Sequence, residues 1–162
     1  MMRCAVLLAG ILAVLAGTSR AQIVDMDAPP KPRAYVLYAA EAQTVPAGKP
    51  GVLQLRFHVV PPFHINSHTP KSELLIPTTL ALEHGDAVKA GALDYPAGQP
   101  YSFSFNPSEK LDVYAGDFTL KLPVTATAGE HTVDGIWKYQ ACDNASCYPP
   151  RTLPVKVVFT AK

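Results

Sequence analysis

The sequence has little net charge, little cysteine and few of the motifs that mark common enzymes. Its 162 residues include 14 basic and 13 acidic residues, so the formal net charge is only +1. A balance this even gives no support for binding to nucleic acid or to an anionic membrane surface. The patterns G-x-S-x-G and H-E-x-x-H and the glycine-rich phosphate loop are all missing. The sequence therefore carries no signature of a hydrolase or of a nucleotide-binding enzyme.

Long apolar runs are also missing beyond the first 21 residues. Ala5–Gly17 is an apolar run of 13 residues, which is short of the roughly 20 residues that a membrane span needs. Arg3 precedes this run, and Ser19-Arg20-Ala21 follows it as a small-x-small cleavage site. These features predict that residues 1–21 are a secretory signal peptide cleaved near Ala21, with an uncleaved membrane anchor as the alternative. The cleaved chain would be exported without stable membrane insertion.

Cleavage would change both the charge and the cysteine count. Loss of the two arginines in the signal leaves 12 basic residues against 13 acidic ones, and loss of Cys4 leaves only Cys142 and Cys147. In an exported protein, two remaining cysteines form a disulfide by default. Residues 22–33 are polar and contain three prolines, which predicts a flexible leader. Residues 34–162 are enough for one domain with a core.

No amphipathic helix is recognisable after residue 33, and proline or glycine interrupts the chain about every 10 to 15 residues. The segments that alternate apolar and polar residues with the period of a half-buried strand are 53–59, 118–124, 131–141 and 153–159. Weaker strand patterns occupy 34–40, 78–83, 88–95, 101–105 and 112–114. We expect 63–77 and 106–108 to be irregular. About eight short strands separated by turns predict an all-β fold, an immunoglobulin-like antiparallel β-sandwich of two sheets.

Cys142 and Cys147 lie in one short loop between two predicted strands, and three interpretations of the pair are open. The first is a structural staple, although the loop-entropy model gives a closed loop of six residues only about 2 kcal/mol, against about 4 or more for long loops. The second is thiol–disulfide exchange, because a thiolate that attacks one sulfur leaves the other as a neighbouring thiol. The third is a metal site, because His64 and His68 together with the two cysteines would match the ligand count of zinc.

The alternatives to exchange each have a physical weakness. A domain of this size with a good core hardly needs so small a staple, and the two histidines lie about 75 residues from the cysteines. We therefore expect His64 and His68 to be loop histidines, and we expect no metal and no other cofactor. The spacing is not C-x-x-C and no βαβ pattern surrounds it, so no helix N-terminus is available to activate a thiol. The pair should then serve a more reactive redox protein, and Pro149-Pro150 would fix the direction in which the chain leaves the loop.

The residues around the cysteines resemble the N-terminal periplasmic domain of the thiol:disulfide interchange protein DsbD. The match rests on Tyr139-Gln140-Ala141-Cys142 and, after four intervening residues, on Cys147-Tyr148-Pro149-Pro150. Further matching segments are Phe63-His64-Ile65-Asn66-Ser67-His68-Thr69-Pro70, Ile76-Pro77-Thr78, Val113-Tyr114, Leu120 and Leu122-Pro123-Val124. The resemblance covers roughly residues 34–159 and implies an immunoglobulin-like sandwich.

The resemblance also implies a role as an electron relay in the periplasm, of the protein-disulfide reductase kind. Cys142 and Cys147 would be the redox-active pair, in which Cys147 forms the mixed disulfide with a partner and Cys142 resolves it. The partners would be thioredoxin-like proteins, such as disulfide isomerases or the thioredoxins of cytochrome c maturation. The residues that would shield the pair are Tyr139 and Tyr148 beside it, and Phe103 or Phe105 as an aromatic cap in the segment 101–105.

The sequence departs from the family in two respects. The loop between the cysteines is one residue shorter than in the best-known member, and neither the family's membrane domain nor its C-terminal thioredoxin domain has a counterpart in the sequence. We therefore expect the reductant to be a separate protein, such as a membrane electron carrier. The alternative function is a non-enzymatic exported binding module with a structural disulfide.

Overall fold

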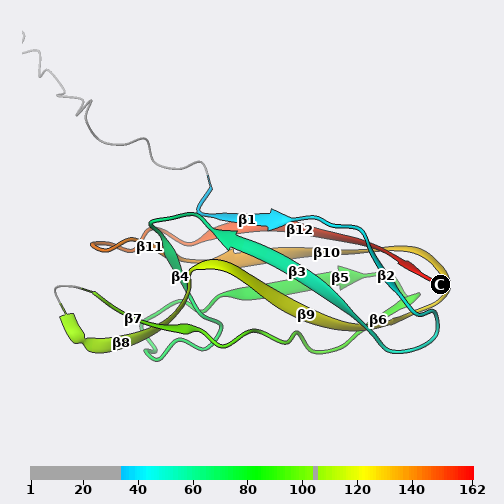
Figure 1. The fold of residues 1–162 in the computed structure, drawn as a ribbon, viewed down its shortest axis with the longest axis horizontal. Helices are drawn as coiled ribbons and strands as arrows, with labels where there is room; N and C mark the ends of the chain where they lie inside the picture. Colours follow the sequence, from blue (N-terminus) through cyan, green and yellow to red (C-terminus); the bar gives the residue numbers. More distant parts are fainter. Residues whose placement is uncertain (1–33, 104–105) are drawn as a thin grey trace, which may run out of the picture. The chain divides into compact units, whose positions relative to one another are not determined.

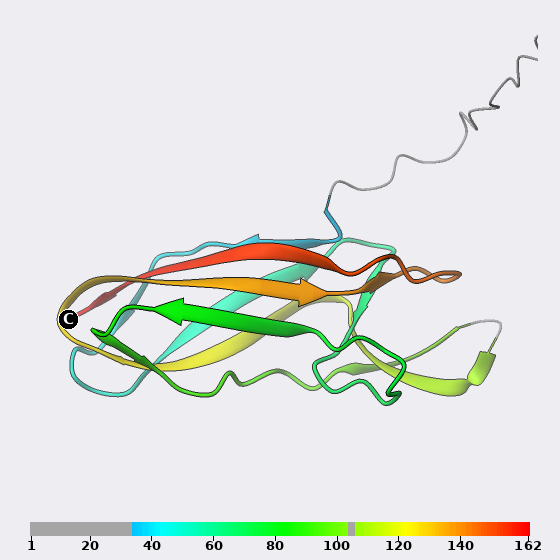
Figure 2. The same cartoon turned by 180° about the vertical axis from the view of Figure 1, so that it is seen from behind.

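A computed structural model describes residues 34–103 and 106–162. The predicted signal peptide (1–21), the predicted leader (22–33) and Phe105 lie outside the described residues. The described part of the chain consists of strands and connections, and no helix in it could cross a membrane. Figure 1 and Figure 2 show the strands from two opposite sides. The all-β prediction is confirmed.

Twelve strands follow one another in the described residues. They are β1 (Val36–Ala39), β2 (Gln43–Val45), β3 (Gly51–Val59), β4 (His64–Asn66), β5 (Thr79–His84), β6 (Val88–Ala90), β7 (Gln99–Phe103), β8 (Asn106–Tyr114), β9 (Gly116–Ala126), β10 (Gly129–Tyr139), β11 (Ala141–Cys142) and β12 (Arg151–Ala161). Two sheets of four strands, β1-β3-β9-β6 and β2-β12-β10-β5, form the sandwich, and the pairing of β2 with β12 is parallel while the other ladders are antiparallel.

The long strands enclose the core because their sequences alternate with period two, so that every second side chain points inward. In β3 the inward residues are Leu53, Leu55, Phe57 and Val59, and all four are buried. The ring of Phe57 stacks on Trp137 of β10 across the sandwich, with a centroid distance of 4.4 Å. Burying an aliphatic or aromatic side chain of this kind contributes about 1.5–3 kcal/mol. The core of the immunoglobulin-like sandwich is therefore the one that the alternation predicts.

A third sheet, with the order β11-β4-β8-β7, goes beyond the two sheets expected from the sequence. Its strand β4 lies within the segment 63–77 that was expected to be irregular, and β8 runs through the break expected at 106–108. Three consecutive buried residues in β4 hide the alternation, and the first half of β8 is largely exposed, so neither strand shows a period of two.

The longest hairpin of the fold positions the cysteines. Strands β10 and β12 pair from Gly129 opposite Ala161 to Tyr139 opposite Arg151, and the connection between them carries β11. Both views place this connection beyond the end of the β10–β12 ladder, at the same end of the sandwich as β7 and β8 (Figure 1, Figure 2). The cysteine loop is therefore the tip of a long hairpin, anchored by the sandwich below it.

Candidate functional site

Cys142 and Cys147 form a disulfide at this tip. The sulfur atoms are 1.97 Å apart and the Cα atoms 3.9 Å apart, and the two residues face each other across a short antiparallel bridge. A backbone hydrogen bond from Tyr148 N to Ala141 O, at 2.8 Å, closes the next step of this small hairpin. Cys142 is only 1% exposed, whereas Cys147 is exposed. The two halves of the disulfide therefore differ in their access to a partner.

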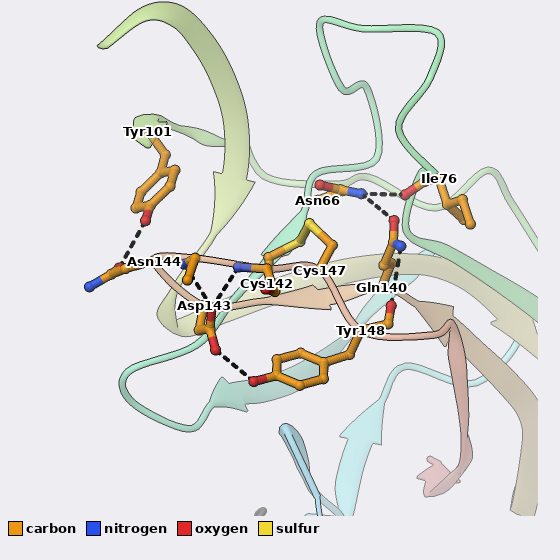
Figure 3. Close-up of a disulfide and its surroundings, with 11 residues drawn as sticks. Asn66, Ile76, Tyr101, Gln140, Cys142, Asp143, Asn144, Cys147 and Tyr148 are labelled. Carbon is orange, nitrogen blue, oxygen red and sulfur yellow. Dashed lines mark hydrogen bonds between the residues drawn. A yellow bond between two sulfur atoms is a disulfide. The ribbon is translucent and has the colours of Figure 1, made fainter. Parts of the chain in front are cut away.

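Asp143 closes the turn between the cysteines. Its backbone N–H donates to Ser146 O at 2.9 Å, and its Oδ1 accepts the backbone N–H groups of Ala145 and Ser146 at 2.8 Å each. Its Oδ2 accepts the hydroxyl of Tyr148 at 2.6 Å (Figure 3). The Tyr148 hydroxyl and the two backbone N–H groups hold the pKa of Asp143 below its ordinary value, and the same carboxylate raises the pKa of Tyr148.

An Asp143→Asn variant is expected to lose an acid-sensitive contribution to stability. Because the folded pKa of Asp143 lies below the ordinary value of 3.8, the carboxylate stabilises the hairpin fully above that pH. This contribution disappears as the pH falls through the lowered pKa. Thermal melts at a series of pH values below about 5 should therefore show a shallower acid-induced decline in the variant than in the wild type. Parallel declines in the two proteins would contradict this role.

Two amide side chains fasten the base of the hairpin to the rest of the domain. Gln140 Nε2 donates to Tyr148 O at 3.1 Å, and Gln140 Oε1 accepts from Asn66 Nδ2 at 3.3 Å (Figure 3). The same Asn66 nitrogen donates to Ile76 O at 3.0 Å. Asn66 is fully buried in β4, so this chain of hydrogen bonds ties the hairpin to the third sheet and to the loop that follows it. Beyond their place in the matching motifs, Gln140 and Asn66 were not predicted to have a role.

Aromatic rings cover one flank of the hairpin. The ring of Tyr148 stacks on Tyr35 at 5.2 Å, and Phe63 meets both edge-on, at 4.7 Å from Tyr35 and 5.9 Å from Tyr148. The guanidinium carbon of Arg151 lies 4.3 Å from the centre of the Tyr35 ring. Tyr148, the residue after Cys147, is thus part of this aromatic group, while Tyr139 lies in the hydrophobic core. Neither Tyr35, which lies in a weak strand pattern, nor Phe63, which entered only as part of a matching segment, was predicted to have a role at the site.

Strand β7 covers the other flank. The ring of Tyr101 lies 4.0 Å from His64, and Phe103 lies 6.0 Å from His64 and 5.5 Å from Tyr101. The hydroxyl of Tyr101 donates to Asn144 Oδ1 at 2.9 Å, which links β7 to the cysteine loop (Figure 3). Of the two expected cap residues, Phe103 packs against His64 and Tyr101, and Phe105 is outside the described residues. Tyr101 makes the contact to the loop.

His64 and His68 lie in different surroundings. His64 was expected in a loop but belongs to β4, where it pairs with Cys142 of β11. His68 does lie in a loop, where its Nδ1 is 2.9 Å from Thr78 O and its ring stacks on Tyr95 at 3.7 Å. Within residues 34–103 and 106–162, no group of three or more His, Cys, Asp or Glu side chains could hold a metal ion. The metal-site interpretation therefore gains no support.

The sequence matches the family described as thiol:disulfide interchange protein DsbD, N-terminal, over residues 33–158. The chain belongs to this DsbD N-terminal family. The match includes the whole disulfide hairpin and the strands that carry it. A comparison with curated protein sequences found no match.

Two solved structures resemble this member of the DsbD N-terminal family. The N-terminal periplasmic domain of ScsB from Proteus mirabilis is 9% identical, with a TM-score of 0.49 over 75% of this chain and 44% of that one. The chain thus spans less than half of the length of the ScsB structure. The DsbD N-terminal domain of Neisseria meningitidis in its reduced form is 15% identical, with a TM-score of 0.40 over 67% of this chain and 81% of that one.

Proposed function

We propose that this domain is a periplasmic thiol–disulfide exchange module that relays electrons between redox proteins by reversible reduction of the Cys142–Cys147 disulfide. One observation carries the proposal: the disulfide forms the tip of a hairpin, with one cysteine exposed and the other buried. A structural disulfide stabilises a fold most when it joins segments far apart in the sequence, whereas this one joins residues five positions apart. Membership of the DsbD N-terminal family supports the same chemistry.

The exchange proceeds in two displacements. A partner thiolate attacks the sulfur of Cys147, the Cys142–Cys147 bond breaks, and its electron pair remains on the sulfur of Cys142. A second thiolate of the partner then attacks the partner sulfur that is bonded to Cys147 and releases Cys147 as a thiolate. The partner is thereby oxidised and the domain is reduced. In the opposite direction, the reduced domain attacks a target disulfide through Cys147, and Cys142 displaces the target. The exposure of Cys147 and the burial of Cys142 favour this division of roles.

The surrounding aromatic residues have a protective role in this proposal. Tyr148 on one flank and Phe103 on the other would shield the disulfide from small thiols, with Phe105 as a further cap residue. Tyr139 would act from the core by holding the base of the hairpin. Thioredoxin-like periplasmic proteins, including disulfide isomerases and the thioredoxins of cytochrome c maturation, would be the partners. A separate membrane electron carrier would supply the electrons.

A direct transfer experiment tests this function. The oxidised domain is mixed with a reduced thioredoxin-like protein, and the thiols are alkylated and counted by mass spectrometry while circular dichroism follows the fold. We expect the two cysteines to become reduced with the strand signal unchanged, because the bond joins two residues of the hairpin tip and no other part of the domain. A pair that becomes reducible only under denaturing conditions would instead indicate a binding module with a structural disulfide.

A Tyr101→Phe variant is expected to let a small thiol reduce the disulfide faster. The substitution removes the hydrogen bond from Tyr101 to Asn144 but keeps the ring on His64. A hydrogen bond of this kind contributes about 0.5–1.5 kcal/mol, so an opening equilibrium of β7 would shift about 2- to 10-fold. The rate of reduction by dithiothreitol measures this shift. The matched control is Tyr38→Phe, which loses a hydrogen bond to Lys156 O instead. Equal rates in the two variants would contradict the role of Tyr101.

A further inference from the structure

Three side chains stand in one row across neighbouring strands at the site. His64 of β4 lies directly opposite Cys142 of β11, and Cys142 lies directly opposite Cys147. Residues that face each other across an antiparallel ladder point to the same face of the sheet, with Cβ atoms about 4.5–5.5 Å apart. The imidazole of His64 is therefore the cross-strand neighbour of the sulfur of Cys142, on the side away from Cys147.

His64 is a buried polar residue with an unpaired ring nitrogen. It is only 2% exposed, and its Nε2 is buried without a hydrogen-bond partner among the described residues. More than about 90% of buried polar groups in proteins have such a partner, and an unpaired one costs about 1–3 kcal/mol. The ring is held in place by Tyr101 at 4.0 Å and by Phe103 at 6.0 Å. A buried nitrogen left unpaired beside a redox-active sulfur calls for a chemical explanation.

We propose that His64 is the proton acceptor for the thiol of Cys142 during the resolving step, an inference that rests on the exchange function proposed above. In the mixed disulfide, Cys142 carries a thiol and Cys147 is bonded to the partner's sulfur. Nε2 of His64 takes the proton from Cys142, and the resulting thiolate attacks the sulfur of Cys147. The bond from Cys147 to the partner breaks, and its electron pair leaves with the partner as a thiolate. In the reverse direction, the imidazolium returns the proton to Cys142 as the disulfide opens.

The electrostatics of the site suit this role. Burial lowers the pKa of His64, so its imidazole is neutral at neutral pH and can accept a proton, while the nearby carboxylate of Asp143 acts in the opposite direction. The ionisable groups brought against His64 are Tyr101 of β7, Cys142 of β11 and Asp143 of the hairpin turn. The hydroxyl of Tyr101 is engaged by Asn144. An imidazolium formed at His64 is therefore balanced by the new thiolate and by Asp143.

The burial of Cys142 explains why a base is needed there. A thiolate at the buried Cys142 would lose its hydration, so loss of the thiol proton is unfavourable unless a proton acceptor lies close by. The site has no helix N-terminus in the described residues that could supply this stabilisation. A positioned base typically accelerates a proton-coupled step by about 10²- to 10⁴-fold.

The resolving step can be timed with an aromatic disulfide reagent, 5,5′-dithiobis(2-nitrobenzoate). The reduced domain releases one thionitrobenzoate when Cys147 reacts and a second when Cys142 displaces the first adduct. In the wild type, the rate of the second release should be nearly independent of pH between about 6.5 and about 8.5. The resting pair, a Cys142 thiol with a neutral His64, carries the same number of protons as the reactive pair, a Cys142 thiolate with a His64 imidazolium, so no proton is exchanged with solvent before the reaction. This pH profile is measured on the wild-type protein alone.

Substitution of His64 should change the shape of this profile. In His64→Phe and His64→Gln, we expect the second release to rise about tenfold per pH unit up to at least about pH 8.5, the ordinary pKa of a thiol. The variants should therefore be about 100-fold slower than the wild type near pH 6.5 and should converge with it at high pH. The matched control, His68→Gln in the loop after β4, should keep the wild-type profile. Melting curves of the oxidised variants check that they are folded.

The outcomes separate this inference from the proposed function. A wild-type second release that rises tenfold per pH unit, or His64 variants with the wild-type rate at neutral pH, would overturn the role of His64. A slowing that is the same at every pH would also overturn it, since that indicates a geometric effect. Failure of the oxidised domain to exchange with a thioredoxin-like protein would overturn the proposed function, whatever the aromatic reagent reports about His64.

Discussion

A Cys142→Ser variant is expected to accumulate a stable mixed disulfide with a thioredoxin-like protein whose own resolving cysteine is replaced by serine, and a Cys147→Ser variant is not. In the first variant the exposed Cys147 remains available to attack, and the buried thiol that would resolve the adduct is gone. In the second, the remaining thiol is the buried Cys142, which a partner's active site cannot approach. Because exchange rates depend on access to the sulfur, we expect the trapped fraction to differ by roughly 100-fold.

The measurement is non-reducing electrophoresis followed by mass spectrometry of the linked peptides. Each variant is reduced and mixed with the same thioredoxin-like protein, which lacks its resolving cysteine and carries thionitrobenzoate on the remaining one, so that attack by Cys147 releases thionitrobenzoate and leaves the mixed disulfide. The double variant lacking both cysteines serves as the blank. Adducts through Cys142 as abundant as those through Cys147 would contradict the assigned order of attack. Adducts with neither variant would favour the binding-module alternative.

A Trp137→Ala variant is expected to lose about 3–5 kcal/mol of unfolding free energy, because truncating a buried aromatic side chain removes its transfer energy and leaves a cavity. Trp137 is fully buried in β10 and contacts the rings of Phe57, Phe118 and Tyr95. Its Nε1 is buried without a hydrogen-bond partner among the described residues. Trp137→Phe, which removes that nitrogen and keeps an aromatic ring, should therefore cost less than Trp137→Ala.

Urea denaturation followed by circular dichroism measures these losses. The matched control is Ile136→Ala, one position away on the same strand, where the side chain is 50% exposed and the expected loss is below about 1 kcal/mol. A loss for Trp137→Ala no larger than for Ile136→Ala would contradict the packing argument. The disulfide should still form in every variant that folds, since its hairpin has its own hydrogen bonds.

The sandwich could be predicted from the sequence because its strands obey a strict alternation. Leu53, Leu55 and Phe57 in β3, and Val133 and Trp137 in β10, are all buried as the pattern predicts. The third sheet could not be predicted in the same way. Strand β4 consists of three buried residues in a row, so it shows no alternation, and its pairing with β11 and β8 joins segments far apart in the chain.

The disulfide could be predicted from the composition and the motif, whereas its surroundings depend on tertiary structure. Cys142 and Cys147 are close in sequence, so their pairing needs no knowledge of the fold. His64 reaches Cys142 only through the β4–β11 ladder, and a lone histidine beside Phe63 reads as an ordinary loop residue. Tyr35 reaches Tyr148 across more than a hundred residues, a contact that local patterns do not reveal.

The turn built by Asp143 has a consequence for the equilibrium between the reduced and the oxidised cysteine pair. The hydrogen bonds to Ser146, Ala145 and Tyr148 involve no sulfur atom, so we expect the turn to stay closed when the disulfide is cleaved. The two thiols then stay side by side at a high effective molarity, and ring closure has little entropy left to lose. Under the proposed exchange function, a preorganised dithiol of this kind would favour its own disulfide, and we expect the hairpin to donate electrons to less constrained partners.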